Sequence, residues 1–196
     1  MTEPQPPLEI ELLPSSASED DATVDRLTDL VNQVYAVAED GMWAPGSTRT
    51  TPAEMAAMVK AGTIAVARRS GRIVGCVRVL RLESGEGEFG LLAADPELRG
   101  IGIGRELVRF AEEVCRRDGL ATMQLEILVP RDWIHPSKEF LMSWYTRIGY
   151  RQVRTGAFEA NYPGLAPLLA THCDFVIYHK DLATTRPSPD TTWGYP

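Results

Sequence analysis

Hydrophobic positions along the chain follow two periods, and each period indicates a different secondary structure. Short runs rich in Val, Ile, Leu and aromatic residues indicate strands, whereas apolar residues spaced three or four apart indicate helices. Strands are predicted over 8–13, 63–68, 72–82, 87–94, 121–129, 150–160 and 173–180. Helices are predicted from Ser18 to Ala38, from Thr51 to Gly62, over 103–118 and from Ser137 to Ile148, with a short piece over 165–169.

Residues suited to capping mark where these helices begin. Ser18 with Asp21, and Thr51 with Glu54, have the spacing of a capping box, in which two residues satisfy free main-chain amides reciprocally. Ser137 is the expected cap of the last long helix. The predicted apolar face of that helix consists of Phe140, Leu141, Trp144, Tyr145 and Ile148.

The order of elements predicts a mixed α/β fold of the α+β kind, with an antiparallel start to the sheet and one crossover helix. A chain of 196 residues is long enough for one domain with its own core, and we assign that domain to residues 8–181. Residues 1–7 and 182–196 are polar and contain several prolines, so both ends are expected to be flexible.

The composition argues against several classes of binding partner. A net charge of −7 argues against nucleic acid, because phosphate binding needs a basic face. No apolar run reaches the length of about eighteen residues typical of a membrane span, so no membrane partner is expected. Three separated cysteines disfavour a disulfide scaffold and a zinc ribbon, and no metal is expected. The N-terminal residues do not have the pattern of a secretory signal, which predicts a cytoplasmic protein.

The stretch ELRGIGIGREL places three glycines at alternate positions before a predicted helix. A glycine turn at a helix start is a general anion site, because the backbone can approach a ligand closely and free amides point at negative charge. A P-loop would need a lysine after the glycines, and a dinucleotide fingerprint would need a glycine where Arg105 or Leu107 stands. The remaining pattern is R-x-x-G-x-G, formed by Arg99, Gly102 and Gly104.

This pattern, together with a second block farther along, resembles the GCN5-related N-acetyltransferase (GNAT) family. LLAADPELRGIGIGRELV resembles the family's fourth strand, pyrophosphate loop and third helix. WYTRIGY resembles its second block, in which a tyrosine, here Tyr145, precedes the glycine–aromatic pair Gly149 and Tyr150. The order of elements from 8 to 180 also matches. The resemblance implies a GNAT-type, mostly antiparallel sheet of six to seven strands flanked by about four helices.

Members of this family transfer the acetyl group of acetyl-CoA to an amine, so acetyl-CoA is the implied co-substrate. Its pyrophosphate is expected on the amides of the glycine turn, with the two isoleucine side chains of the turn directed into the core. Its pantetheine arm is expected along the preceding strand, where a main-chain N–H would reach the thioester oxygen. The cofactor residues implied in this way are Leu92, Ala93, Ala94, Arg99, Gly100, Ile101, Gly102, Ile103, Gly104 and Arg105.

Acetyl transfer needs a neutral amine and a proton for the departing thiolate. The resemblance places Tyr145 at the family's acid position. A tyrosine hydroxyl suits this role, since it can donate a proton without first being ionised; an ordinary core tyrosine is the alternative. Glu88 is ranked first as the base, acting through a water, although it could belong to a solvated hairpin tip. His135 is ranked behind it. Glu126 lies between apolar neighbours, so it needs a partner or faces the site.

The resemblance places the acceptor walls in residues 38–50, between the first two helices, and in residues 160–175, in the last hairpin. The expected lining residues are Trp43, Met42 and Tyr162, and Glu39 and Asp40 are candidates for holding an ammonium group. Lys138 departs from the family pattern, which often has asparagine at this position.

The predicted function is that of an acyl-CoA-dependent N-acyltransferase (EC 2.3.1 type). It would transfer an acetyl group to a primary amine by direct attack in a ternary complex, and a small molecule is the favoured acceptor. The rival interpretation is a non-catalytic acyl-CoA-binding or regulatory domain with the same fold. Because dimers are frequent among relatives, a homodimer is one expected assembly.

Overall fold

The computed structural model describes residues 7–183, which form a seven-stranded sheet with five α-helices. The strands are β1 (Glu9–Leu12), β2 (Ile64–Arg69), β3 (Arg72–Arg81), β4 (Gly87–Ala94), β5 (Thr122–Pro130), β6 (Arg151–Ala157) and β7 (Cys173–Asp181). The helices are α1 (Asp21–Ala38), α2 (Pro52–Lys60), α3 (Ile103–Arg117), α4 (Pro136–Arg147) and α5 (Phe158–Asn161). Short 3-10 segments are η1 (Ser15–Glu19), η2 (Pro96–Leu98) and η3 (Ala166–Leu168).

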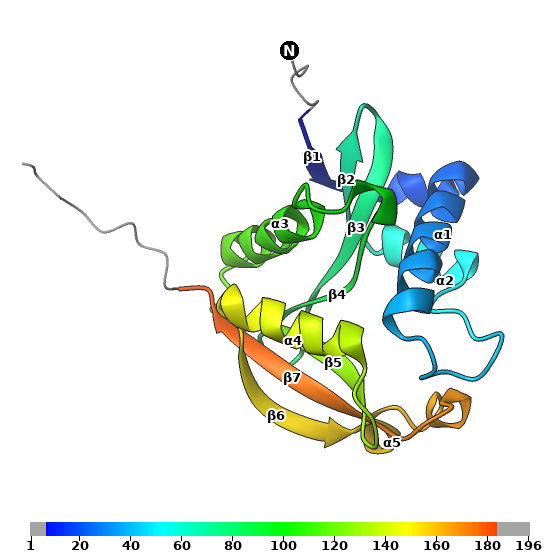
Figure 1. The fold of residues 1–196 in the computed structure, drawn as a ribbon. Helices are drawn as coiled ribbons and strands as arrows, with labels where there is room; N and C mark the ends of the chain where they lie inside the picture. The colour runs from blue at the N-terminus through cyan, green and yellow to red at the C-terminus, as the bar shows by residue number, and fades with distance from the viewer. Residues whose placement is uncertain (1–6, 184–196) are drawn as a thin grey trace, which may run out of the picture.

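The sheet has the order β1-β2-β3-β4-β5-β7-β6. Its described strand pairs are antiparallel except for β4 with β5, which is parallel. Figure 1 shows α3 and α4 on one side of the sheet and α1 and α2 on the other. α5 is a single turn, so four longer helices flank the sheet. This architecture confirms the fold class expected from the sequence.

Two hydrophobic cores lie on the two faces of the sheet. Successive side chains of a strand point to opposite faces, so β3 contributes Val77 and Val79 to the core under α3 and Cys76 to the core under α1 and α2. α3 covers its face with an apolar stripe that includes Leu107 and Ala111. The local alternation read from the sequence therefore determines which residues each layer of helices buries.

An irregularity in β4 separates it from β5. Leu91 has a φ of 47°, and the register of β4 against β3 shifts between Cys76 and Arg78. Positive φ is rare for a residue with a side chain, and bulges of this kind bend a strand. β4 pairs with β5 only at Gly87 and Glu88, near the start of both strands. Beyond Glu88 the two strands no longer pair and diverge (Figure 1), and residues of both strands line a cavity that opens between them.

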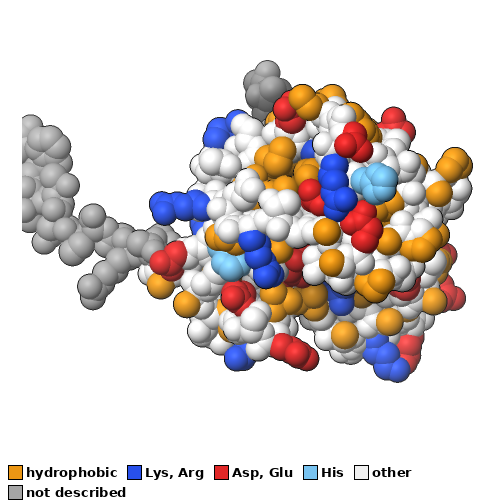
Figure 2. Space-filling model, turned by 90° about the horizontal axis from the view of Figure 1, so that it is seen from below, with side chains coloured by type: hydrophobic (Ala, Val, Ile, Leu, Met, Phe, Trp, Pro, Cys, Tyr) orange, Lys and Arg blue, Asp and Glu red, His pale blue; other side chains and the backbone are white. Residues whose placement is uncertain are grey.

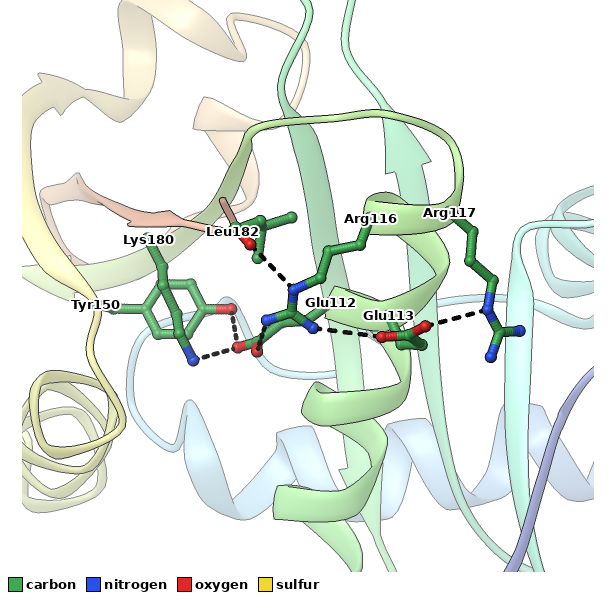
Figure 3. A network of polar contacts seen from close by, with 7 residues as sticks. All are labelled: Glu112, Glu113, Arg116, Arg117, Tyr150, Lys180 and Leu182. Atoms are coloured by element: carbon green, nitrogen blue, oxygen red, sulfur yellow. Dashed lines mark hydrogen bonds and ion pairs between the residues drawn. The ribbon is translucent and has the colours of Figure 1, made fainter. Parts of the chain in front are cut away.

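Buried polar contacts fasten the end of α3 to β7 (Figure 3). Glu112, only 3% exposed, accepts a hydrogen bond from the Tyr150 hydroxyl at 2.9 Å and forms an ion pair with Lys180 at 2.8 Å. Arg116 also contacts Glu112, at 3.2 Å, and donates to the carbonyl of Leu182 at 3.1 Å. Each polar group of this network that is removed from water thus has a partner, as a buried charge requires.

Residues 1–6 and 184–196 lie outside the described residues, so the structure does not test the flexibility expected of segments 1–7 and 182–196. Leu182 is described, and it is 3% exposed with its amide bonded to the carbonyl of Ala121 at 2.8 Å. The packed part of the chain therefore extends to Leu182, one residue past the domain boundary expected at residue 181.

Two of the three predicted helix caps differ in the structure. The capping box at Thr51 is present as predicted. Ser18 instead lies in η1, where its hydroxyl donates to the carbonyl of Ser15, and α1 begins after it. α4 is capped by His135, whose Nδ1 accepts the Ser137 amide at 3.2 Å. The cause is Pro136, whose fixed φ suits the first helical position and moves the cap one residue before it.

Two further expectations on element faces and lengths were wrong. Phe140 is 63% exposed rather than part of the apolar face of α4. The strand predicted over 150–160 ends at Ala157, because Phe158 begins α5 and is buried in a small core with Met42. Tertiary burial of one aromatic side chain thus ends the strand where the local pattern would extend it.

The face of the molecule in Figure 2 carries basic and acidic side chains side by side, with hydrophobic groups between them. It offers no continuous basic surface of the kind that binds nucleic acid. Among residues 7–183, no helix has both the length and the hydrophobicity needed to cross a membrane.

Candidate functional site

The glycine turn is open at the start of α3. Gly100 and Gly102 have φ values of 85° and 88°, which explains glycine at both positions, and Gly102 is the N-cap of the helix. A Cβ added at Gly100, Gly102 or Gly104 would meet no atom within 4 Å. Within the described chain, no hydrogen bond uses the main-chain amides of residues 100–105 as donors. Free amides at a helix N-terminus can bind an anion.

Only one of the two isoleucine side chains of the turn enters the core, although both were expected to do so. Ile103 is buried, 3% exposed, but Ile101 is 40% exposed and does not enter the core. The φ of 88° at Gly102 turns the chain between them, so the two side chains leave in different directions. Arg99 and Arg105 are exposed, and neither forms an ion pair with a described residue. Both guanidinium groups are therefore available near the open amides.

The last part of β4 connects this turn to the opening in the sheet. Ala93 is buried against the α1 and α2 side, whereas Leu92 and Ala94 are partly buried on the α3 side. Ala93 and Ala94 pair with β3, but the described residues of β5 do not pair with them. One edge of this strand thus remains free to hydrogen-bond an extended ligand.

A cavity of about 380 Å³ occupies the opening between β4 and β5. Its lining includes Glu88 to Leu92 from β4, Leu125 to Leu128 from β5, and Tyr145 from α4. Tyr145 is buried among aromatic rings, with ring centroids 4.8 Å from Trp144 and 5.8 Å from Phe89. Burial, with a smaller contribution from Tyr35, raises the pKa of Tyr145 well above its ordinary value. Its hydroxyl therefore stays protonated, as a proton donor must be.

The carboxylates of Glu88 and Glu126 line the same cavity, as does that of Glu39. Glu88 accepts a hydrogen bond from Gln124 at 2.8 Å, and the other end of that amide contacts His179 at 2.9 Å. Glu126 accepts the hydroxyl of Tyr162 at 3.2 Å. Burial, reinforced by the charge of Glu88, raises the pKa of Glu126 above its usual value. Glu88 is thus a side chain of the cavity, and the structure does not place it at a solvated hairpin tip.

His135 lies outside this cavity. It is 6% exposed, one of its ring nitrogens caps α4, and its ring lies 5.3 Å from that of Trp133. The described residues that line the cavity do not include it. Its role is to end the loop and start the helix, which sets the position of Tyr145 farther along α4.

The two expected acceptor walls contact each other. Trp43 and Leu169 form an isolated β-bridge, and the amide of Ala170 donates to the carbonyl of Met42 at 3.0 Å. Trp43 and Tyr162 line the cavity. Met42 does not, because it is 0% exposed and packs in the small core with Phe158. Met42 instead packs beneath the residues that line this wall of the cavity.

Comparison with known proteins decides the family. The model of the acetyltransferase (GNAT) family matches residues 28–136. The chain belongs to the GNAT family of acetyltransferases. An IAA acetyltransferase of Azospirillum brasilense is 42% identical over 62 residues, which are 31% of this chain and 40% of that protein. The chain therefore spans less than half the length of this curated relative.

Solved structures show the same fold at low sequence identity. YncA of Salmonella typhimurium, solved with acetyl-CoA, is 14% identical, has a TM-score of 0.60, and is matched over 94% of this chain and 99% of its own. An agmatine N-acetyltransferase is 14% identical, has a TM-score of 0.62, and is matched over 89% and 99%. This agreement confirms the GNAT fold for the described residues.

The site of this GNAT acetyltransferase contains a side-chain pairing that the sequence did not predict. Lys138 and Glu39 form a buried ion pair at 3.1 Å, and the Trp43 indole donates to the same carboxylate at 2.7 Å. Glu39 is therefore occupied and not free to hold an ammonium group, contrary to the expectation. Burial lowers the pKa of Lys138, although Glu39 opposes this. Both residues were noted in the sequence, but nothing in the sequence indicated that they form a pair.

A second cavity, of about 810 Å³, extends the site between α1, α2 and the segment that joins them. It shares Tyr35, Arg49 and Arg78 with the first cavity. Burial raises the pKa of Tyr35 to about 12, and the Arg49 guanidinium lies 5.1 Å from the centroid of its ring. None of these three residues belongs to a recognisable sequence motif. Only their position in the lining of both cavities identifies them as residues of the site.

Proposed function

We propose that this protein transfers the acetyl group of acetyl-CoA to a primary amine of a small molecule, by direct attack within a ternary complex. One observation carries the proposal: the opening between β4 and β5 brings Tyr145, from the α3 and α4 side of the sheet, into one cavity with Glu88 and Glu126. A proton donor and two carboxylates therefore face the same space, which is the arrangement that amine acylation requires.

Cofactor binding is assigned to the glycine turn and the end of β4. The free amides of residues 100–105, the dipole of α3 and the side chains of Arg99 and Arg105 suit a pyrophosphate. The free edge of Leu92 to Ala94 suits the amides of a pantetheine arm. Acetyl-CoA, when bound, supplies the activated thioester. A main-chain N–H of β4 would polarise the thioester carbonyl.

Proton transfer is assigned to two side chains. Tyr145, whose raised pKa keeps it protonated, would donate to the departing thiolate. Glu88, held by Gln124, would remove a proton from the attacking amine through a water. Glu126 supports this arrangement, since a second carboxylate favours ammonium entry and its raised pKa lets it exchange a proton nearer neutral pH.

A small acceptor fits the size of the cavity, and agmatine N-acetyltransferase, one of the structural neighbours, is named for a small amine. We assign the reaction to the cytoplasm, which agrees with three buried cysteines that remain free thiols.

The experiment is release of thiol from acetyl-CoA against a panel of small amines, with CoA binding measured by calorimetry. Turnover of any amine, dependent on Tyr145, is the expected result. CoA binding without turnover across the panel would contradict the transferase proposal and favour the non-catalytic binding domain. Absence of CoA binding would contradict both.

A further inference from the structure

Arg78 is a partly buried charged side chain of the cavity for which residues 7–183 provide no hydrogen-bond or ion-pair partner. It lies on β3 opposite Gly90 and lines both cavities. Its Nε is buried without a hydrogen-bond acceptor, and within residues 7–183 its guanidinium forms no ion pair. A buried donor without a partner is rare in native proteins and costly, so it calls for an explanation. The explanation is that a group of the bound substrate accepts the hydrogen bond of this donor.

The neighbouring charges do not neutralise Arg78. Lys138 is paired with Glu39, and Arg49 lies over the ring of Tyr35 at the rim of the cavities. The two carboxylates also have other partners, because Glu88 accepts from Gln124 and Glu126 from Tyr162. No residue within the described chain therefore brings a negative oxygen to the guanidinium of Arg78.

Positive and negative groups are separated across the site. Arg78 faces Gly90 across the β3–β4 pair, and Glu88 lies two residues along β4 from that position. This diagonal relation in an antiparallel pair corresponds to about 7–8 Å between main-chain positions. Gly90 has no side chain, and a Cβ added there would meet no atom within 4 Å. The space between the guanidinium and the carboxylates is thus open to a small ligand that carries both charges.

We propose that Arg78, assisted by Arg49 at the rim, binds an acidic group of the acceptor, so that the acceptor is an amino acid or another small amine with a carboxylate. A guanidinium binds a carboxylate through two parallel hydrogen bonds, which a neutral group cannot reproduce. The acid would fix the acceptor and place its amine toward Glu88 and Glu126. This inference rests on the proposed acetyl transfer and names the substrate class of that site.

The proposal predicts a preference for acids over their neutral analogues. The probes are the α-amino acids, ω-amino acids of three to six carbons, and the primary amide of each, with thiol release from acetyl-CoA as the readout. A site built to hold a charged group discriminates strongly against an analogue that leaves the group unpaired. The wild-type protein should therefore use at least one acid with a kcat/KM about tenfold or more above that of its amide.

Two variants test whether Arg78 causes the preference for acids over their amides. Arg78→Met should reduce the acid-to-amide ratio of kcat/KM to near one, mainly through KM for the acid, with CoA affinity unchanged. Arg81→Met is the matched control, because Arg81 is an exposed residue of the same strand, and it should keep the ratio. Equal use of acids and amides by the wild type, or an equal loss for both in Arg78→Met, would overturn the proposal.

If no amine is turned over, calorimetry with the CoA-saturated protein separates the two proposals. Binding of an acid but not its amide, lost in Arg78→Met and kept in Arg81→Met, would support the acid site while contradicting acetyl transfer. Binding that does not depend on the acid, or no binding of any probe, would overturn the acid site.

Discussion

Lys138 and Glu39 form an ion pair of 3.1 Å that joins the first turn of α4 to the residue after α1, with both side chains no more than 7% exposed. The Trp43 indole adds a hydrogen bond to the same carboxylate. The pair lies at the wall of the cavity, so it holds the two helices at a fixed separation where the acceptor is expected to enter.

Removing one member of this pair should destabilise the protein more than removing both. Lys138→Met leaves the Glu39 carboxylate buried with only the indole as a partner, and such a change typically costs about 3–5 kcal/mol. Lys138→Met combined with Glu39→Gln removes the stranded charge and should recover much of that loss. Urea unfolding at constant m-value measures both free energies. A double variant no more stable than the single one would show that the pair is not coupled.

Tyr145→Phe should keep CoA affinity and lose about 10²- to 10⁴-fold in turnover, the range attributed to a positioned acid. The ring would remain packed against Trp144 and Phe89, so folding should change little. Thiol release at saturating acceptor gives kcat, and calorimetry gives the affinity for CoA. Unchanged turnover would remove Tyr145 from the mechanism and leave it a core tyrosine.

Glu88→Gln should lower kcat by about 10²-fold or more, because an amide cannot accept the proton of the amine. The hydrogen bond from Gln124 can be kept, since the glutamine carbonyl still accepts. Glu83→Gln is the control, because Glu83 is exposed at the turn between β3 and β4. Equal activity of both variants would assign Glu88 to the scaffold and exclude it as the base.

Gly104→Leu separates cofactor binding from folding. Nothing lies within 4 Å of a Cβ at this position, and leucine favours the helix over glycine by about 0.5–1 kcal/mol. The variant should therefore be at least as stable as the wild type but bind CoA about tenfold or more weakly, a change of about 1.4 kcal/mol. Thermal unfolding and calorimetry test the two effects separately. Unchanged affinity would contradict pyrophosphate binding at the turn.

Glu126→Gln should change the pH dependence of stability. Burial raises the pKa of Glu126 in the folded state, so the folded protein binds more protons than the unfolded chain between the two pKa values. Its contribution to stability is thus present below the unfolded pKa and lost as pH rises through the folded pKa. Glu126→Gln should be more stable than the wild type at pH 8, with no difference near pH 3. Urea unfolding across this range measures it, and a constant difference would contradict the assigned cause.

The sequence was most informative where structure follows from local pattern. The strand over 87–94 and the helix start at Ile103 appear where they were predicted. Glycine at positions 100 and 102 satisfies a local requirement of the turn, since both residues have positive φ. His135 and Phe140 show the limit of the same reasoning, because a proline at the next residue moved the cap and tertiary packing selected a different helix face.

By itself, the sequence determined the order of elements, the open turn before α3 and the tyrosine of α4, because each depends on neighbours a few residues away. Only the tertiary structure decided that Arg78, Glu88, Glu126 and Tyr145, from four different elements, line one cavity. The physical reason is the bulge at Leu91 and the short pairing of β4 with β5. Strand register and separation depend on contacts between distant parts of the chain, which no local period encodes.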